Sequence, residues 1–508
     1  MMAACNFNQL RCLLATSLLI GCLAKIWAGA LFNFNVYTLA LRDTFNYTQT
    51  DINTMAILTN VGLSFCLPAG ILHDKYGPRF TTFLSLILSF LAYILIWSTS
   101  KNVEFYRHNA WLLKLYYFFL GQGTTFMYMS SFVTNISNFE SKYRGKVVGL
   151  LDSCFGGSPT IFALVYATCF VNGHITDDEN QNWPGYIVVL LVGSTITYSL
   201  CVLLLRVRPD GIDTENEANV ELRAPAQKPN TEDTELVEAD ELGNRYDGTD
   251  IVFDNNQETK TGTGIGNSSE SGTVVGQRSE EIGSSTHSTL FQKIKEEWYD
   301  FKGTLFKREY LCLLFVKSFV TPIAFVYITN ITAILKAARL EQYSATMTIL
   351  FPFVGIGGRI IIAIIADCFP TVLHRSIILL VTNMGFVIAQ ALLIGLATDL
   401  TILFITTILI SIAISCSWSL LPVILSDLFP MRNFGRNWGA MLFMSSILSA
   451  VFYPFLFGAV YDAHTEDGSR NCYGLYCTQL TFIVTFACSL IGLCINVALV
   501  IILRNKQN

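Results

Sequence analysis

Charged residues are scarce in this sequence. Of its 508 residues, 14% are Asp, Glu, Lys or Arg and 52% are apolar, whereas roughly 25% of an average soluble domain is charged. Several catalytic signatures are also missing: the G-x-S-x-G of hydrolases, the glycine loop of ATP-binding proteins and the HExxH of zinc proteases. The sequence therefore predicts neither an enzyme of these classes nor an ATP-driven pump.

Cysteine is present, but not in the pattern of a disulfide framework or a metal site. Most of the 14 cysteines stand singly inside apolar runs, where Cys is a small hydrophobe. No CxxC pairs with a second CxxC or with two His, so we expect no metal and no cofactor. Cys472 and Cys477 differ, because they flank Gly474 in the polar segment EDGSRNCYGLYC. They predict a disulfide facing an oxidising compartment; the alternative is two free thiols.

Long apolar runs are what the sequence does contain. About twelve runs of about 20 residues match the thickness of a bilayer and predict an all-α protein with twelve transmembrane helices in two six-helix bundles. The first run extends from about Cys12 to Leu41. A cleaved signal peptide is the alternative, but its apolar core would be only about 7–15 residues long. We therefore expect a retained helix.

A change in composition divides the chain into three segments. Residues 1–208 are expected to form the first bundle. Residues 209–290 are strongly acidic and rich in Ser, Thr, Gly and Asn, which predicts a disordered cytosolic linker. Residues 291–508 begin with an amphipathic segment, expected at the membrane interface, and continue into the second bundle.

Lysine and arginine predict the orientation in the membrane. Most of them fall in loops and helix ends on the side of the N-terminus, which places both termini and the linker in the cytosol. Asn46 then begins a glycosylation sequon, Asn-Tyr-Thr, in the first loop on the opposite side. Nothing in the sequence selects between the plasma membrane and an endolysosomal or vacuolar membrane.

The segment after the second apolar run carries a motif. GILHDKYGPR, residues 70–79, resembles the loop motif of the major facilitator superfamily, G-x-x-x-D-R/K-x-G-x-R/K. Glycine permits close packing and a tight turn, and a carboxylate can cap a helix end. A shift of 293 positions superimposes Asp74 on Asp367, and facilitators consist of two repeated halves. The expected gating residues are Gly70, Asp74, Lys75, Gly77, Arg79 and Asp367.

A closer resemblance covers most of the apolar part. NFESKYRGKVVGLLDSCFGG, GIGGRIIIAIIAD and DLFPMRNFG look like segments of the nodulin-like facilitators, which usually have Lys where this chain has Asp152. The resemblance implies a secondary transporter for a small organic solute, of monocarboxylate or amino-acid type. A proton is the candidate coupling ion, and no nucleic acid partner is expected. The alternative is a membrane scaffold or signalling protein that acts through its acidic linker.

Charges at bilayer depth mark candidate functional residues. Asp152 and Arg359 each lie about 12 Å from the cytosolic end of a helix, and we expect them to form an ion pair between the bundles, at least in the state closed to the cytosol. The alternative is that Arg359 binds an anionic solute and Asp152 carries a proton or only contacts water. Lys25, Asn33 and Tyr37 share one helical face, although polar residues in membranes also bond neighbouring helices. The expected substrate cavity comprises Lys25, Asn33, Tyr37, Gln122, Thr125, Tyr128, Tyr327, Asn330 and Trp418.

Overall fold

The computed structural model describes residues 2–171, 181–207, 295–369, 371–447, 453–464 and 472–507. Met1–Glu217 and Phe301–Asn508 belong to one compact unit, and Ala218–Asp300 form a second. Of the second unit only residues 295–300 are described, and they are helical. The linker predicted at 209–290 lies outside the described residues.

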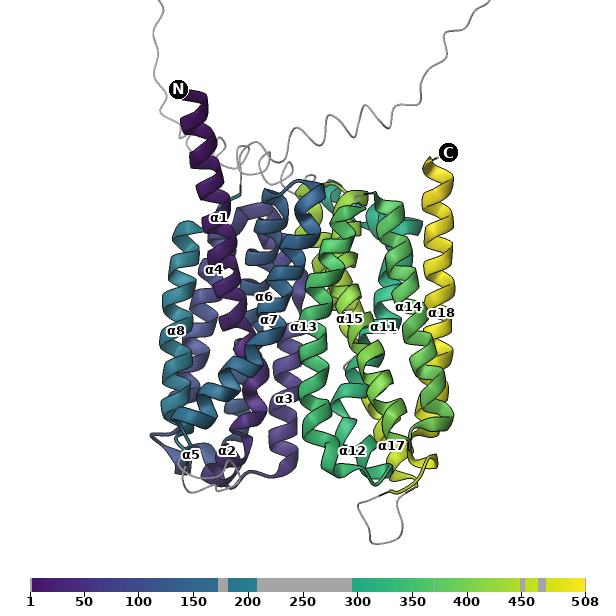
Figure 1. The fold of residues 1–508 in the computed structure, drawn as a ribbon. Coiled ribbons are helices and arrows are strands. Elements are labelled where there is room, and N and C mark those ends of the chain that lie inside the picture. Colours follow the sequence, from purple (N-terminus) through teal and green to yellow (C-terminus); the bar gives the residue numbers. More distant parts are fainter. Residues whose placement is uncertain are drawn as a thin grey trace, which may run out of the picture. The chain divides into compact units, whose positions relative to one another are not determined.

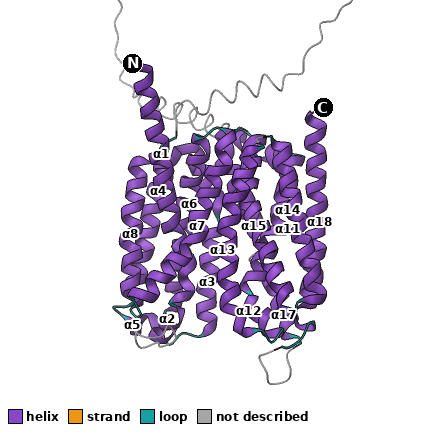
Figure 2. Cartoon of the chain, in the orientation of Figure 1, coloured by secondary structure: helices purple, strands orange, loops and turns teal. Residues whose placement is uncertain are grey.

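The described residues are helical apart from turns and an isolated bridge between Val171 and Gln181 (Figure 2). The N-terminal bundle consists of α1 (Met2–Gly29), the 3-10 turn η1 (Ala30–Val36), α2 (Thr38–Phe45), α3 (Gln49–Ser64), α4 (Cys66–Thr99), α5 (Val103–His108), α6 (Ala110–Asn138), α7 (Ser141–Cys169) and α8 (Trp183–Leu204).

The C-terminal bundle follows the same plan. It consists of α11 (Arg308–Thr329), α12 (Ile331–Ala337), η4 (Glu341–Tyr343), α13 (Ser344–Cys368), α14 (Val372–Leu396), α15 (Leu400–Leu428), η5 (Met431–Asn433), α16 (Phe434–Ile447), α17 (Tyr453–Asp462) and α18 (Tyr476–Gln507).

The described helices account for twelve membrane crossings. Nine stretches are long and apolar enough to span a bilayer, and one of them, Asp51–Thr99, has 49 residues. This stretch reverses direction at Gly77, whose φ of 77° is a conformation that glycine adopts freely, so it crosses twice. The less apolar α6 and the pair α16 and α17 supply the other two crossings.

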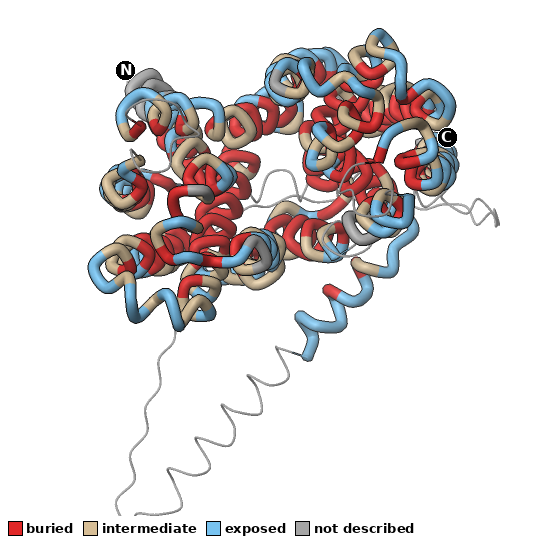
Figure 3. Tube along the Cα trace, turned by 90° about the horizontal axis from the view of Figure 1, so that it is seen from below, coloured by how far each residue is buried: buried red, intermediate tan, exposed pale blue. Residues whose placement is uncertain are grey.

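Both termini lie on the same side of the bundles, as Figure 1 shows. We call this the terminal side, and the opposite side, near α2, α5, α12 and α17, the distal side. Each crossing reverses the chain, so the turn at Gly77, after two crossings, lies on the terminal side. In Figure 3 the buried positions point into each group of helices and the exposed positions point outward, as expected where lipid surrounds the protein.

The apolar cores show how the two bundles meet. In the terminal half, one cluster joins residues of both bundles, among them Phe132 and Leu151 with Leu420 and Trp438. In the distal half, separate clusters occupy the two bundles, one around Tyr186 and the other around residues of α11, α14 and α15. The bundles are therefore packed together on the terminal side and apart on the distal side.

Candidate functional site: a central cavity closed on the terminal side

A cavity of about 540 Å³ lies between the bundles and is lined by α3, α6 and α7 on one side and α11, α13, α15 and α16 on the other. Its walls are mostly apolar. The lining extends to Ile57, Phe325 and Thr329, which are exposed in the distal half, while the joint apolar core lies beneath it on the terminal side. The cavity therefore opens to the distal side.

Asp152 projects into this cavity from α7, and its carboxylate is paired with Lys25 of α1. The Nζ of Lys25 lies 3.2 Å from Oδ1 of Asp152 and 3.1 Å from the centre of the Tyr128 ring. The Tyr128 hydroxyl donates to the same Oδ1 at 3.3 Å. Lys25 is fully buried behind Asp152 and is not part of the lining.

The ion pair predicted between Asp152 and Arg359 is not formed in this structure. Arg359 instead donates from Nη1 to the backbone carbonyl of Asp152 at 2.9 Å, because Lys25 already occupies the carboxylate from within the same bundle. The depth argument identified the two residues as neighbours but could not assign the partner atoms. Gly156 makes room for Arg359, since a Cβ there would overlap the guanidinium.

Lys317 is a second cation of the cavity lining. It comes from α11, is fully buried, and its Nζ lies 3.9 Å from the centre of the Trp418 ring, a cation–π contact. Within the described part of the chain, its ammonium has no hydrogen-bond partner.

Only part of the predicted substrate cavity lines the observed one. Thr125, Tyr128 and Trp418 do. The other six bond neighbouring groups: Lys25, Asn33 (to Tyr186), Tyr37 (to Tyr117), Gln122 (to the Gly62 carbonyl), Tyr327 (to Thr407) and Asn330 (to the Val326 carbonyl).

The positions of Asn33 and Tyr37 away from the cavity lining have a local cause. The helix ends at Gly29, where a Cβ would overlap the Phe155 carbonyl oxygen of α7, and a 3-10 turn follows. Helical spacing from Lys25 therefore does not apply beyond this point.

Sequence reasoning also missed a serine ladder on α15. Ser411, Ser415 and Ser419 donate to the carbonyls of residues 351, 355 and 359 of α13 at 2.6, 2.9 and 3.5 Å. Each partner lies 60 positions earlier, so α13 and α15 are fixed in register beside the cavity. The S-x-x-x-S-x-x-x-S spacing was the available signal.

Asp74 joins the bundles at the terminal end of the first seam, between α4 and α16. Its carboxylate accepts backbone N–H bonds from Gly435 at 2.9 Å and Arg436 at 2.6 Å, at the start of α16, where a negative charge is favourable. Gly70 lies against this helix start, because a Cβ there would overlap the Gly435 carbonyl oxygen. Lys75 and Arg79 flank the Gly77 turn without a bond across the seam among those described.

Asp367 makes the equivalent contact in the second seam, between α13 and α7. Its carboxylate accepts from the backbone of Gly145 at 3.0 Å and of Lys146 at 2.8 Å. The sequence did not predict the ionic contacts that reinforce this seam: Arg375 lies 2.5 Å from Asp427 and donates to the Ser141 carbonyl at 2.8 Å. The terminal side is thus closed twice, by related contacts.

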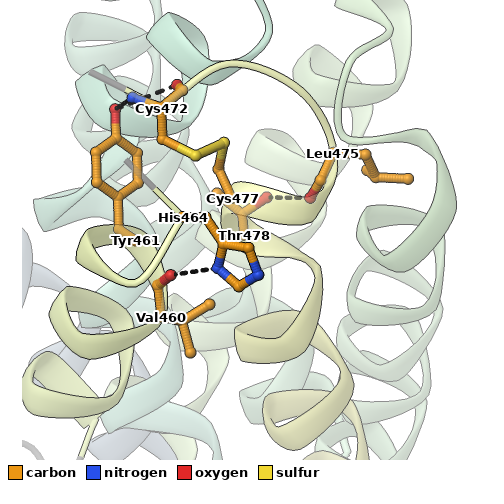
Figure 4. The surroundings of a disulfide bond; sticks show 7 residues. All are labelled: Val460, Tyr461, His464, Cys472, Leu475, Cys477 and Thr478. Carbon is orange, nitrogen blue, oxygen red and sulfur yellow. Dashed lines mark hydrogen bonds between the residues drawn. A yellow bond between two sulfur atoms is a disulfide. The ribbon is translucent and has the colours of Figure 1, made fainter. Parts of the chain in front are cut away.

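The last distal loop carries a disulfide between Cys472 and Cys477, shown in Figure 4 with its neighbours. The backbone N–H of Cys472 donates to the Tyr461 hydroxyl at 3.3 Å. Gly474 has a φ of 106° and donates to the Ala337 carbonyl at 2.8 Å. Asn46 is exposed at the end of α2, also on the distal side.

A family model described as Major Facilitator Superfamily matches residues 18–454. The chain belongs to the major facilitator superfamily. Solved structures agree on the fold: the proton:xylose symporter XylE, with a TM-score of 0.60 and 12% identity, covers 95% of this chain and 94% of its own. A bacterial homologue of the iron transporter ferroportin, in an outward-facing state, has a TM-score of 0.58 and 12% identity. The match covers 96% of this chain and 99% of the homologue. The predicted all-α facilitator fold is confirmed.

Curated relatives of this facilitator carry the name Probable transporter MCH1. The Debaryomyces hansenii protein is 26% identical over 146 residues, 28% of this chain and 29% of the relative. The Candida albicans protein is 25% identical over 200 residues, 38% of this chain and 45% of the relative, so these two matches span less than half of each relative. The Emericella nidulans protein is 21% identical over 92% of this chain and 83% of its own.

Proposed function

We propose that this facilitator is a secondary transporter that carries a small organic solute bearing a carboxylate, of monocarboxylate or amino-acid type, by alternating access. The observation that carries the proposal is the cavity between the bundles, open to the distal side and closed on the terminal side by two related seams. Opening the seams and closing the distal half would present the same cavity to the other side, as repeat-based transporters do.

The cations of the lining support a carboxylate-bearing solute. Arg359 and Lys317 both reach the cavity, and a guanidinium matches a carboxylate with parallel N–H bonds. A solute without an anionic group would leave both cations without a partner, which is costly at bilayer depth.

Asp152 is the proposed carrier of a coupled proton. One of its oxygens, Oδ2, is buried and has no hydrogen-bond partner among the described residues, and the other is shared by Lys25 and Tyr128. XylE and the E. coli protein FucP, whose fold this chain shares, are proton symporters for xylose and fucose. In this proposal the terminal side is cytosolic, as the basic residues predict.

Uptake by the purified full-length protein in liposomes tests the proposal. Monocarboxylates, amino acids and sugars would be offered with and without an inward pH gradient, and we expect uptake of a carboxylate-bearing solute that the gradient accelerates. Deletion of residues 211–290 should leave uptake largely intact, whereas a scaffold acting through this segment would lose its function. Uptake of no solute at all would refute the transporter. Membership of the nodulin-like branch stays a prediction.

A further inference from the structure

We infer that the solute is a small organic dianion with two separated anionic groups, one bound at Lys317 and the other at Arg359. The inference rests on the proposed transport of a carboxylate-bearing solute and favours a dianion over the monocarboxylate and the amino acid. It follows from the charge balance of the cavity, from the placement of its two cations and from the polar atoms that lack partners.

The charges of the cavity do not balance. Lys317, Arg359 and Asp152 line it, and Lys25 lies directly behind Asp152. The ion pair of Lys25 and Asp152 is neutral, so two positive charges remain in excess. Arg359 is partly exposed in the open cavity, whereas Lys317 is already fully buried against Trp418. Alternating access must pass through a state closed on both sides, where uncompensated charges are costly. A dianion would neutralise that state with Asp152 ionised, and with the proposed proton on Asp152 it would leave fewer positive charges than a monoanion.

The two cations stand apart, which favours two anionic groups over one. Lys317 belongs to α11 and Arg359 to α13, and α15 packs against both helices. Lys317 faces Trp418 of α15 and Trp438 of α16, whereas the Arg359 guanidinium reaches the Asp152 carbonyl of α7 at 2.9 Å. The ammonium and the guanidinium therefore lie at different walls of the cavity.

Both cations retain unused donors. The Nζ of Lys317 and the Nε of Arg359 are buried without a hydrogen-bond partner among the described residues. Buried donors normally have partners, so these are the groups that a ligand would satisfy. The apolar wall between them, with Trp418 and Phe351, fits a hydrocarbon body better than a polyhydroxylated one.

An amino acid is the strongest competing substrate. Its carboxylate would bind Arg359, and its ammonium would meet the free Oδ2 of Asp152. This arrangement leaves Lys317 without a partner, and because an amino acid has no net charge, the closed cavity keeps two excess positive charges. A monocarboxylate leaves one excess positive charge. The dianion alone uses both cations.

Matched ligands distinguish these classes. Malonate, succinate, glutarate and phthalate would each be compared with the half-amide that replaces one carboxylate, and 4-aminobutyrate would represent a zwitterion. Affinity is measured by thermal shift of the full-length protein and by competition for uptake. A charged hydrogen bond corresponds to roughly a ten- to hundredfold change in affinity, so we expect at least one dicarboxylate to bind at least tenfold more tightly than its half-amide.

Lys317→Gln should abolish this preference, so that the dicarboxylate binds no more tightly than its half-amide, whereas Lys317→Arg should retain part of the preference. Lys101→Gln is the matched control, because Lys101 is exposed in a loop, 5.2 Å from the ring of Trp97. Arg359→Gln removes the other cation and should also abolish the preference for the dicarboxylate. This second variant separates the loss of a cation from a folding defect specific to position 317.

Uptake of monocarboxylates or 4-aminobutyrate with no dicarboxylate preference would overturn the dianion and leave the transporter standing. A dicarboxylate preference that survives Lys317→Gln would overturn the role of Lys317. No uptake of any ligand in this panel or of the monocarboxylates, amino acids and sugars offered above would refute both proposals.

Discussion

Replacing Asp74 with Ala should open the terminal side. The change removes two charge-assisted hydrogen bonds, to the N–H groups of Gly435 and Arg436, and a negative charge at the start of α16. Each such bond contributes about 1.5–3 kcal/mol. When the seam separates, water replaces part of the lost hydrogen bonding, so we take the lower value for each bond. The free-energy difference between the closed and open states should therefore change by about 3 kcal/mol in total. That corresponds to a roughly 150-fold change in the balance between the two states.

Cys66 provides the assay. It lines the cavity and lies beneath the first seam, where a Cβ on Gly439 would stand 2.7 Å from the Cys66 carbonyl oxygen. A variant with Cys66 as its one free cysteine would be placed in inside-out vesicles and treated with an impermeant maleimide. The terminal side of these vesicles faces the reagent, so labelling of Cys66 should be slow in the parent and much faster with Asp74→Ala.

Asp43→Ala is the control for this experiment, since Asp43 is an exposed distal carboxylate that pairs with Arg42 at 3.4 Å. It should change neither labelling nor uptake. If Asp74→Ala leaves both the labelling rate and the uptake kinetics at parental values, then Asp74 does not hold the terminal side closed and the reasoning is wrong.

Three further changes test separate contacts. Gly156→Ala should reduce solute affinity in binding assays, because its Cβ overlaps the guanidinium in the cavity, whereas Gly157→Ala should have little effect, since it meets one flexible side chain at 3.1 Å. Lys25→Met should destabilise the protein by about 3–5 kcal/mol by leaving Asp152 unpaired, and the added change Asp152→Asn should restore part of its thermal stability. Asn46→Gln should remove a glycan-dependent gel shift in eukaryotic cells; an unchanged shift would exclude glycosylation there.

The sequence predicted the fold better than the cavity, and the reasons are physical. Apolar runs determine crossings almost by themselves, because a bilayer core satisfies no backbone polar groups. The Asp74 motif is equally local, since its turn and its cap lie within ten residues. Its partners on α16, by contrast, lie more than 350 positions away, and no local pattern encodes them.

The partners of side chains near the cavity depend on contacts between segments that are distant in the sequence, and residue spacing does not reveal them. Lys25 has the depth of a ligand-binding residue, yet Asp152 of the same bundle neutralises it. Helical position alone does not distinguish Tyr327 from Trp418, but the Tyr327 hydroxyl bonds Thr407 inside the bundle. The position of Lys317 in the sequence does not decide its direction, because a long side chain near a helix end can reach the interface; its contact with Trp418 shows that it turns inward.

The excess positive charge of the cavity has a consequence for the return half of the cycle. An empty carrier that closes on both sides would enclose two uncompensated cations, whereas the solute would compensate them in a loaded carrier. The empty protein should therefore reorient slowly, and a second solute on the far side should speed the return of the site. At the same pH gradient, we expect preloaded vesicles to take up labelled solute much faster than empty ones.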